Sequence, residues 1–154
     1  MNPSKTEFLE TIASLLGNKG RSVWTAHPEM SVFEALALMS VREVGALPVV
    51  SGGRLVGLFS ERDYARKVIL KGRSSRDTVV SDIMTAPVIS VTSQATVGEC
   101  MHTMTAHHVR HLPVVEDEKL AGIISIGDLV NSIISAQEKT IRHLHDYISG
   151  AYPG

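Results

Sequence analysis

A four-residue sequence occurs twice in the chain, and this internal repeat most limits how the chain can fold. Leu47-Pro48-Val49-Val50 returns as Leu112-Pro113-Val114-Val115, an offset of 65 residues. The same offset, carried without a gap, aligns further identical residues: Val23 with Val88, Val32 with Val97, Glu34 with Glu99, Gly57 with Gly122, Ser60 with Ser125, and Asp63 with Asp128. A gapless register over roughly 50 residues indicates the duplication of one supersecondary unit.

Each copy carries the same order of local signals. A short β-prone run comes first, then a helix whose N-cap is followed three residues later by Glu, then two strands joined by a turn, then a second helix. In the first copy these are 23–26, the helix after Ser31, 46–50, 55–59 and the helix from Ser60; in the second they are 88–91, the helix after Thr96, 111–115, 120–124 and the helix from Ser125. The unit is therefore predicted to be β-α-β-β-α, present twice.

A copy of about 50 residues buries too little surface to be stable alone. We therefore expect an α/β (α+β) fold in which the two copies pack sheet to sheet around a pseudo-two-fold axis. Apolar stripes, one starting at Phe8 and one running from Ile133 to Ile148, predict extra N- and C-terminal helices that serve as packing or dimer surfaces. The expected segments are an N-terminal helix at 1–18, repeat 1 at 19–71, a linker at 72–82, repeat 2 at 83–136, and a C-terminal helix and tail at 137–154.

Charge and cysteine content exclude several classes of protein. The chain has 15 Lys and Arg against 16 Asp and Glu, so it lacks the basic excess that drives binding to nucleic acid or a membrane surface. The single cysteine, Cys100, excludes an intrachain disulfide and suits a reducing compartment. No apolar stretch approaches the ~20 residues that cross a bilayer, and the charges of Lys5 and Glu7 interrupt any signal-peptide core. We expect a cytoplasmic protein with neither a membrane nor a nucleic-acid partner.

The segments Gly57-Leu58-Phe59-Ser60-Glu61-Arg62-Asp63 and Gly122-Ile123-Ile124-Ser125-Ile126-Gly127-Asp128, each after a Leu-Pro-Val-Val strand, resemble the cystathionine-β-synthase-type (CBS) domain. The two copies together resemble the tandem CBS pair, or Bateman module, and the C-terminal ending is similar to that of stand-alone bacterial members. The resemblance implies a non-catalytic regulatory module for signal transduction. It further implies adenosine-containing ligands (AMP, ADP, ATP, NAD(H) or S-adenosylmethionine) in clefts between the copies. We expect a homodimer that passes the ligand state to an unknown effector protein.

The repeated Ser-x-x-Asp sequence suits such a ligand chemically. A carboxylate accepts two hydrogen bonds and so fits the paired hydroxyls of a ribose, while a serine hydroxyl near a helix start fits a phosphate. The resemblance implies that Asp63 and Asp128 hold riboses, that Ser60 and Ser125 stand near phosphate, and that Arg62 clamps phosphate. The alternative is a purely structural capping box, and the two roles are compatible.

The resemblance also implies which residues contact the base, through the backbone of the segment before each Leu-Pro and from the opposite copy. These residues are Val44, Gly45 and Ala46 in the first copy and Val109, Arg110 and His111 in the second. Thr85, Val88 and Ile89 are expected to complete the cleft that holds Asp63, and Arg21, Val23 and Trp24 the cleft that holds Asp128. Arg110 and His111 can also reach phosphate; the alternative is that they are exposed polar residues at a strand start.

Two other interpretations stay open. The histidines between His102 and His111 suggest a metal-binding protein, although Cys100 is the one acid or thiol nearby that could complete a tetrahedral site. The chain can also be a scaffold or dimerisation module with empty clefts.

Catalysis is not supported, because no Walker A loop, dinucleotide fingerprint or nucleophile elbow occurs. Cys100 aligns with Ala35 at an apolar helix position, which predicts an inert core thiol. We therefore expect no enzyme activity, catalytic cofactor or metal.

Overall fold

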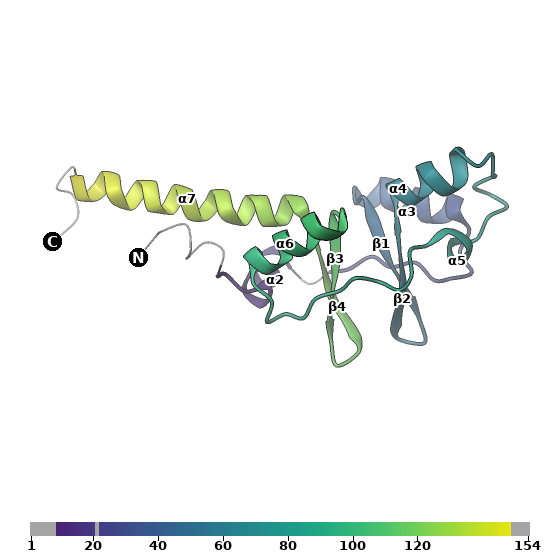
Figure 1. Ribbon diagram of the computed structural model, residues 1–154, viewed down its shortest axis with the longest axis horizontal. Helices are drawn as coiled ribbons and strands as arrows, with labels where there is room; N and C mark the ends of the chain where they lie inside the picture. The colour runs from purple at the N-terminus through teal and green to yellow at the C-terminus, as the bar shows by residue number, and fades with distance from the viewer. Residues whose placement is uncertain (1–8, 21, 149–154) are drawn as a thin grey trace. The chain divides into compact units, whose positions relative to one another are not determined.

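The computed structural model describes residues 9–20 and 22–148 (Figure 1). The expectations for Phe8, for Arg21 and for the tail at 149–154 lie outside these residues. The described chain forms two compact units. Unit one comprises residues 9–20, 91–112 and 124–148, and unit two comprises residues 22–90 and 113–123.

Unit two is built around the antiparallel hairpin of the first copy. Strand β1 (Ala46–Ser51) pairs with β2 (Arg54–Ser60), and helix α3 (Val32–Arg42) packs on this hairpin. The short helices α4 (Glu61–Tyr64) and α5 (Val80–Ile83) and a π-helical turn, η1 (Ala65–Ile69), belong to the same unit, as do residues 113–123. Their apolar side chains form one buried core, whose members include Val32, Ala35, Met39, Leu47, Val49, Phe59, Val68, Val80 and Ile83.

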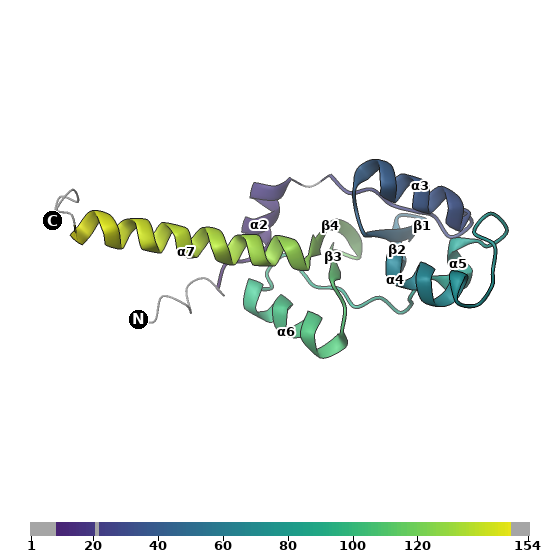
Figure 2. The ribbon, with the colours of Figure 1, turned by 90° about the horizontal axis from the view of Figure 1, so that it is seen from above.

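Unit one contains the helices of the second copy and the helix that precedes the first copy. Helix α2 (Ile12–Lys19), helix α6 (Val97–His107) and the first half of helix α7 (Ile126–Ile148) lie together in it (Figure 2). The backbone fixes α2 to the segment before α6, because the amide of Ile12 donates to the carbonyl of Ala95 at 2.8 Å. In return, the amide of Val97 donates to the carbonyl of Glu10 at 2.8 Å. The second hairpin, β3 (His111–Glu116) with β4 (Lys119–Ser125), is the other small sheet.

The predicted N-caps are observed in both copies. The Ser31 hydroxyl accepts from the amide of Glu34, and the Thr96 hydroxyl accepts from the amide of Glu99, each at 3.1 Å. The helices that start there also end alike, since Glu43 and His108 both adopt the left-handed conformation. The sequence prediction of an α+β fold with two small antiparallel sheets is therefore confirmed.

Two local predictions are wrong. The run at 23–26 is not a strand, because only Ala26 forms a bridge, with Val49. The run at 88–91 is not a strand either and contains a single bridged residue, Val91. A proline next to each run, Pro28 or Pro87, lacks the N–H that a longer ladder needs.

The second helices of the two copies differ from each other. In the first copy the helix changes after Tyr64 into the π-helical turn η1. In the second copy, α7 runs without a break through residue 137, where the sequence suggests the start of a separate C-terminal helix. The second helix of repeat 2 and the C-terminal helix are therefore one element of 23 residues.

Gly57 offers a test of the packing in unit two. A Cβ at this position would clash with Sδ of Met84 and lie 2.9 Å from its Cγ, so we expect Gly57→Ala to destabilise the protein by about 1–3 kcal/mol through overpacking. Gly17 is the matched control, because a Cβ there meets nothing within 4 Å. Gly17→Ala in helix α2 should stabilise by about 0.5–1 kcal/mol. Chemical denaturation measures both; equal stabilities for the two variants would contradict the packing at Gly57.

Candidate functional site

The first candidate site surrounds the carboxylate of Asp63, which follows strand β2. Oδ2 of Asp63 accepts from the amide and the hydroxyl of Ser60, each at 3.0 Å. In return, the amide of Asp63 donates to Oγ of Ser60 at 3.2 Å. This reciprocal capping box fixes the carboxylate at the strand-to-helix junction.

The other oxygen of Asp63 is also engaged. Oδ1 accepts from the hydroxyl of Thr85 at 2.9 Å and lies 3.0 Å from Nζ of Lys67. Lys67 also donates to the carbonyl of Ile83 at 3.1 Å. The Asp63 side chain is only 8% exposed, whereas that of Lys67 is 43% exposed. The structure thus brings Ser60, Asp63 and Thr85 together, and Lys67 closes the site.

The second candidate site surrounds Asp128 in unit one and repeats the capping box. Oδ2 of Asp128 accepts from the amide of Ser125 at 2.8 Å, and the amide of Asp128 donates to Oγ of Ser125 at 3.1 Å. The same Oδ2 lies 2.5 Å from Nζ of Lys19, the last residue of α2. The Asp128 side chain is 21% exposed, so this site is more open than that of Asp63.

The electrostatics of the second site set two pKa values. Burial raises the pKa of Asp128, but hydrogen bonds from Lys19 and Ser125 and the charge of Lys19 outweigh it, and the net pKa lies below 3.8. Burial lowers the pKa of His111 below 6.5, and the charges of Lys19 and Arg110 lower it further, against the opposing effect of Asp128. At neutral pH the site therefore holds an ionised carboxylate beside a neutral imidazole.

The segments before each Leu-Pro lie beside the helix start of their own copy. The carbonyl of Gly45 accepts from the amide of Glu61 at 3.1 Å, and the carbonyl of Arg110 accepts from the amide of Ile126 at 2.9 Å. Val44 and Gly45 are half-buried and line a pocket of about 350 Å³ together with Leu36, Met39, Ser40, Glu43 and Glu61. That these segments contact a base from the opposite copy stays a prediction.

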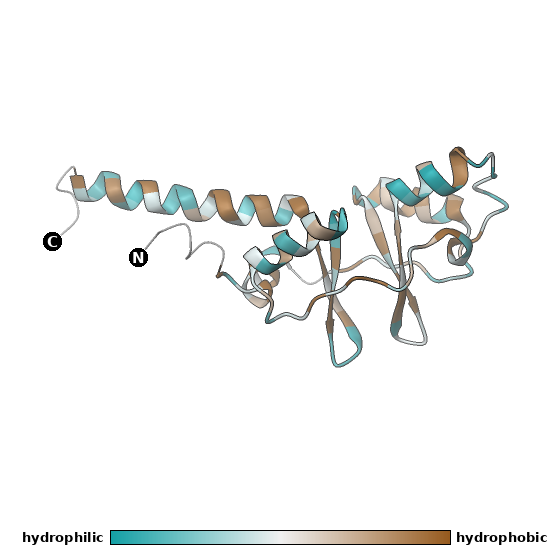
Figure 3. Ribbon diagram, viewed as in Figure 1, coloured by the Kyte–Doolittle hydropathy of each residue, from teal (hydrophilic) through white to brown (hydrophobic). Residues whose placement is uncertain are grey.

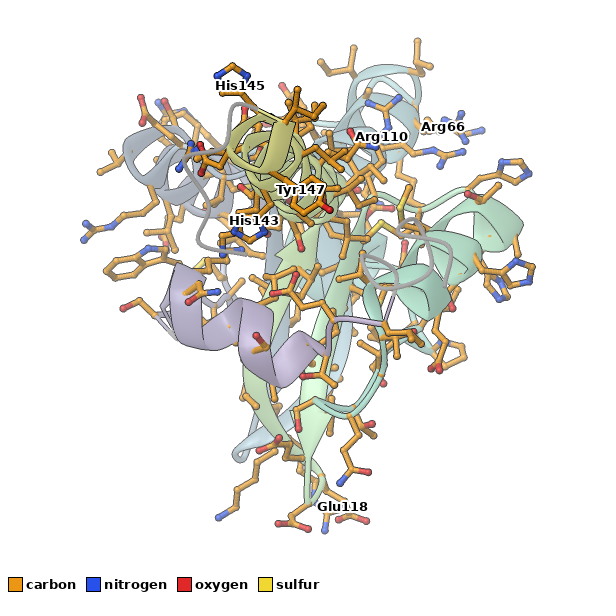
Figure 4. All side chains as sticks on the ribbon, turned by 90° about the vertical axis from the view of Figure 1, so that its left-hand side faces the viewer. Arg66, Arg110, Glu118, His143, His145 and Tyr147 are labelled. Atoms are coloured by element: carbon orange, nitrogen blue, oxygen red, sulfur yellow. The ribbon has the colours of Figure 1, made fainter. Side chains whose placement is uncertain are left out.

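The remaining predicted residues vary in exposure. Arg62 and Arg110 are exposed, Val88, Ile89, Val109 and His111 are half-buried, and Ala46 is buried. Figure 4 labels Arg110 among the side chains. Trp24 is 41% exposed and lies under the guanidinium of Arg42, whose Cζ is 3.7 Å from the ring centroid.

The histidine stretch does not assemble into a metal site in the structure. His102, His107 and His108 are exposed. Within residues 9–20 and 22–148, no three His, Cys, Asp or Glu side chains are grouped so that they could hold a metal ion. Cys100 is fully buried, and burial, with a contribution from Glu99, raises the pKa of its thiol to about 11. A thiol that stays protonated at neutral pH is a poor nucleophile.

The repeated hairpin and helix, each with a reciprocally bonded Ser-x-x-Asp, define a tandem regulatory fold, and comparison with known proteins gives its family. The CBS domain family matches residues 20–69 and 80–135, so the chain belongs to the CBS domain family and carries two CBS domains. A pair of CBS domains is a regulatory module. In the described part of the chain, none of the helices is both long and apolar enough to traverse a bilayer.

Several relatives cover most of the chain. The CBS domain-containing protein CBSX3, mitochondrial, from Arabidopsis thaliana is 38% identical over 152 residues, which is 92% of this chain and 73% of that protein. A CBS-domain protein from Burkholderia ambifaria MC40-6 has a solved structure that is 47% identical, with a TM-score of 0.78 over 81% of this chain and 94% of that one. The CBS domain pair of protein MJ0100, solved with 5′-methylthioadenosine and S-adenosyl-L-methionine, is 25% identical, with a TM-score of 0.72 over 80% of this chain and 94% of that one.

The two lysines are the site residues that sequence reasoning missed. Lys67 was recognisable in principle, because it lies four residues after Asp63, a spacing at which opposite charges meet on a helix. Lys19 gave no local signal, since 109 residues separate it from Asp128.

Removing the ammonium of Lys19 tests the electrostatics of the second site. In Lys19→Met the pKa of Asp128 should rise, because only the hydrogen bonds from Ser125 then oppose the effect of burial. The pKa of His111 should also rise, since a neighbouring positive charge is lost. NMR titration of the carboxyl and imidazole signals measures both, with the exposed Lys139→Met as control.

The sign of the pH effect follows from the lowered pKa values. A lowered Asp128 pKa contributes stability above the unfolded value of 3.8 that is lost as pH falls through the folded pKa. The pKa of His111 is also lower in the folded protein than the unfolded value of 6.5. As pH falls below 6.5, the unfolded chain therefore binds a proton more readily than the folded one, and the folded protein loses stability. Unchanged titration of both groups in Lys19→Met would contradict the assigned contact.

Proposed function

We propose that the chain is a non-catalytic sensor that binds an adenosine-containing ligand at the Asp63 and Asp128 sites and reports the bound state to an effector protein. The candidate ligands are AMP, ADP, ATP, NAD(H) and S-adenosylmethionine. The proposal includes a cytoplasmic location and a homodimer. It draws on the family and on the ligands of the MJ0100 domain pair, which are both adenosine derivatives.

One observation carries the proposal: both copies hold an acid at the same place, three residues into the helix that follows the hairpin. In each copy the capping box occupies one carboxylate oxygen and fixes its direction. A lysine also contacts the carboxylate in both copies: Lys67 lies at the other oxygen of Asp63, and Lys19 lies at the same oxygen of Asp128 that the capping box holds. A carboxylate held in this way can accept from a ribose diol once the lysine moves.

The lysine has a second role in this proposal. Lys67 is 43% exposed and Lys19 is 35% exposed, so each ammonium can leave the carboxylate without crossing the core. A diol that replaces it leaves a positive charge beside the bound sugar. That charge suits the phosphate of a nucleotide, and at the Asp128 site Arg110 adds a second cation, with bidentate geometry.

The two sites differ in what the displaced lysine is attached to. Lys67 belongs to the same helical segment as Asp63, so its release is local. Lys19 ends helix α2, which remains fixed at its other end by the bond from Ile12 to Ala95. A ligand at Asp128 therefore frees the last turn of α2, which is a change that an effector protein can read.

The scaffold function is favoured by a specific observation. Asp63 is buried, and Ser60, Thr85 and Lys67 occupy both of its oxygens. A purely structural acid would show the same bonds. The two functions differ in whether small molecules bind to the folded protein.

Titration of AMP, ATP, S-adenosylmethionine and NADH by calorimetry tests the proposal. At least one should bind, and Asp63→Asn with Asp128→Asn should weaken that binding by roughly tenfold to a hundredfold, because a charged acceptor is lost from each site. Asp82→Asn is the control, since Asp82 is exposed and pairs only with Arg73 among the ion pairs observed. Absence of binding for all four ligands would favour the scaffold.

The role of Lys19 predicts opposite effects on nucleoside and nucleotide. In Lys19→Met, adenosine should bind more tightly than to the wild type, because no ammonium competes for Asp128. ATP should gain less or bind more weakly, since the phosphates lose a cation. The ratio of the two dissociation constants, measured with Lys139→Met as control, should therefore shift toward adenosine; equal changes for both ligands would reject the role.

A further inference from the structure

Helix α7 carries two apolar stripes, and its own unit uses only one. The stripe of Leu129, Ile133, Ala136 and Thr140 is buried or half-buried. A second stripe is exposed: Val130 by 40%, Ile134 by 45%, Ile141 by 65%, Leu144 by 57% and Ile148 by 81%. Figure 3 shows apolar residues recurring along the whole helix. Such a second stripe is not needed to pack a helix onto its own domain.

The second stripe follows a seven-residue repeat. Ile134, Ile141 and Ile148 are spaced by seven residues, and so are Val130, Gln137 and Leu144. These are the a and d positions of a heptad, and we call the six residues the α7 seam. Isoleucine at every a position with Val and Leu at two of three d positions is the pattern of a parallel two-stranded coiled coil.

The described residues of the chain leave much of the α7 seam exposed. In Figures 1 and 2 the second half of α7 extends past both α2 and α6, the other helices in the described part of its unit. Residues 141–145, 147 and 148 are all exposed, so this half of the helix does not obtain its stability from the described part of unit one. A short helix without packing is marginal in water, which indicates that a further surface covers it.

We infer that the α7 seam pairs with the α7 seam of a second copy of this chain, in parallel, which gives the homodimer of the proposed function its interface. Gln137 selects this occupant, because a parallel pair places Gln137 against its own counterpart and the two amides can bond each other. An antiparallel pair would set each amide against an apolar a-position residue, and burying an unbonded amide is unfavourable.

The flanking charges agree with a parallel pair. The residues beside the seam at e and g would face one another as Glu138 with Ile133 and His145 with Thr140, so no like charges meet. Lys139, Arg142 and His143 fall at the b, c and f positions, away from the seam. Figure 4, which looks along α7, shows His143 and His145 on opposite sides of the helix.

The seam is short, which sets the expected strength. From Val130 to Ile148 it spans about 27 Å, fewer than three heptads. We therefore expect a dimer whose population depends on concentration rather than an obligate one.

Sedimentation velocity across a roughly hundredfold concentration range tests the pairing. The wild type should shift from monomer to dimer, and Ile141→Glu with Leu144→Glu should raise the dissociation constant by roughly a hundredfold or more. Ser135→Glu with Arg142→Gln is the matched control, because it adds the same net negative charge to exposed b positions of the helix and should dimerise like the wild type. Circular dichroism checks that both variants keep their helix content.

Gln137→Cys tests the direction. Parallel helices place these thiols against each other, so oxidation should give a disulfide-linked dimer, while the buried Cys100 stays reduced. A wild type that remains monomeric, or a seam variant that dimerises as well as the wild type, would overturn the inference. In the latter case the dimer uses another face, and ligand binding, measured separately, still decides the proposed function.

Discussion

The bond between a serine and an aspartate three residues later organises both copies of the repeat. A strand must end and a helix begin within a few residues, which leaves amide groups without partners. Asp63 and Asp128 satisfy them, since each carboxylate accepts from the serine amide while its own amide donates to the serine hydroxyl. The same contact fixes the direction of the carboxylate, so one side chain meets both the requirement of the backbone and that of the candidate site.

The repeat, the caps and the hairpins could be predicted because each depends on neighbouring residues. Ser31 and Thr96 are recognisable from three following residues, and the paired strands from alternating apolar residues and a turn. The first strands could not be assigned correctly, because whether Ala26 alone or a longer run pairs depends on Val49, more than twenty positions away. The β-propensity of a segment shows that it can adopt an extended conformation, whereas strand pairing depends on which other segment the fold places beside it.

The residues of the candidate sites also fall into two groups, those that neighbouring sequence predicts and those that depend on distant residues. Ser60, Asp63 and Thr85 lie together as predicted, although Thr85 was placed there by the resemblance rather than by spacing. The lysine of the first site is a helical neighbour of its acid, while the lysine of the second comes from a helix outside the repeat. Duplication therefore copied the acid and the cap, but the two counterions have separate origins, and only the local one leaves a trace in the sequence.

Because α7 is continuous, a small movement at the Asp128 site can displace the far end of the helix. Asp128 lies in the first turn of a rod that ends at Ile148, about 30 Å away. A tilt of roughly 10° at its base would move the far end by about 5 Å, close to one helical turn. A rearrangement too small to disturb the capping box can therefore change which residues meet at the C-terminal end of α7. A straight helix of this length converts a small tilt at its base into a displacement as large as a side chain.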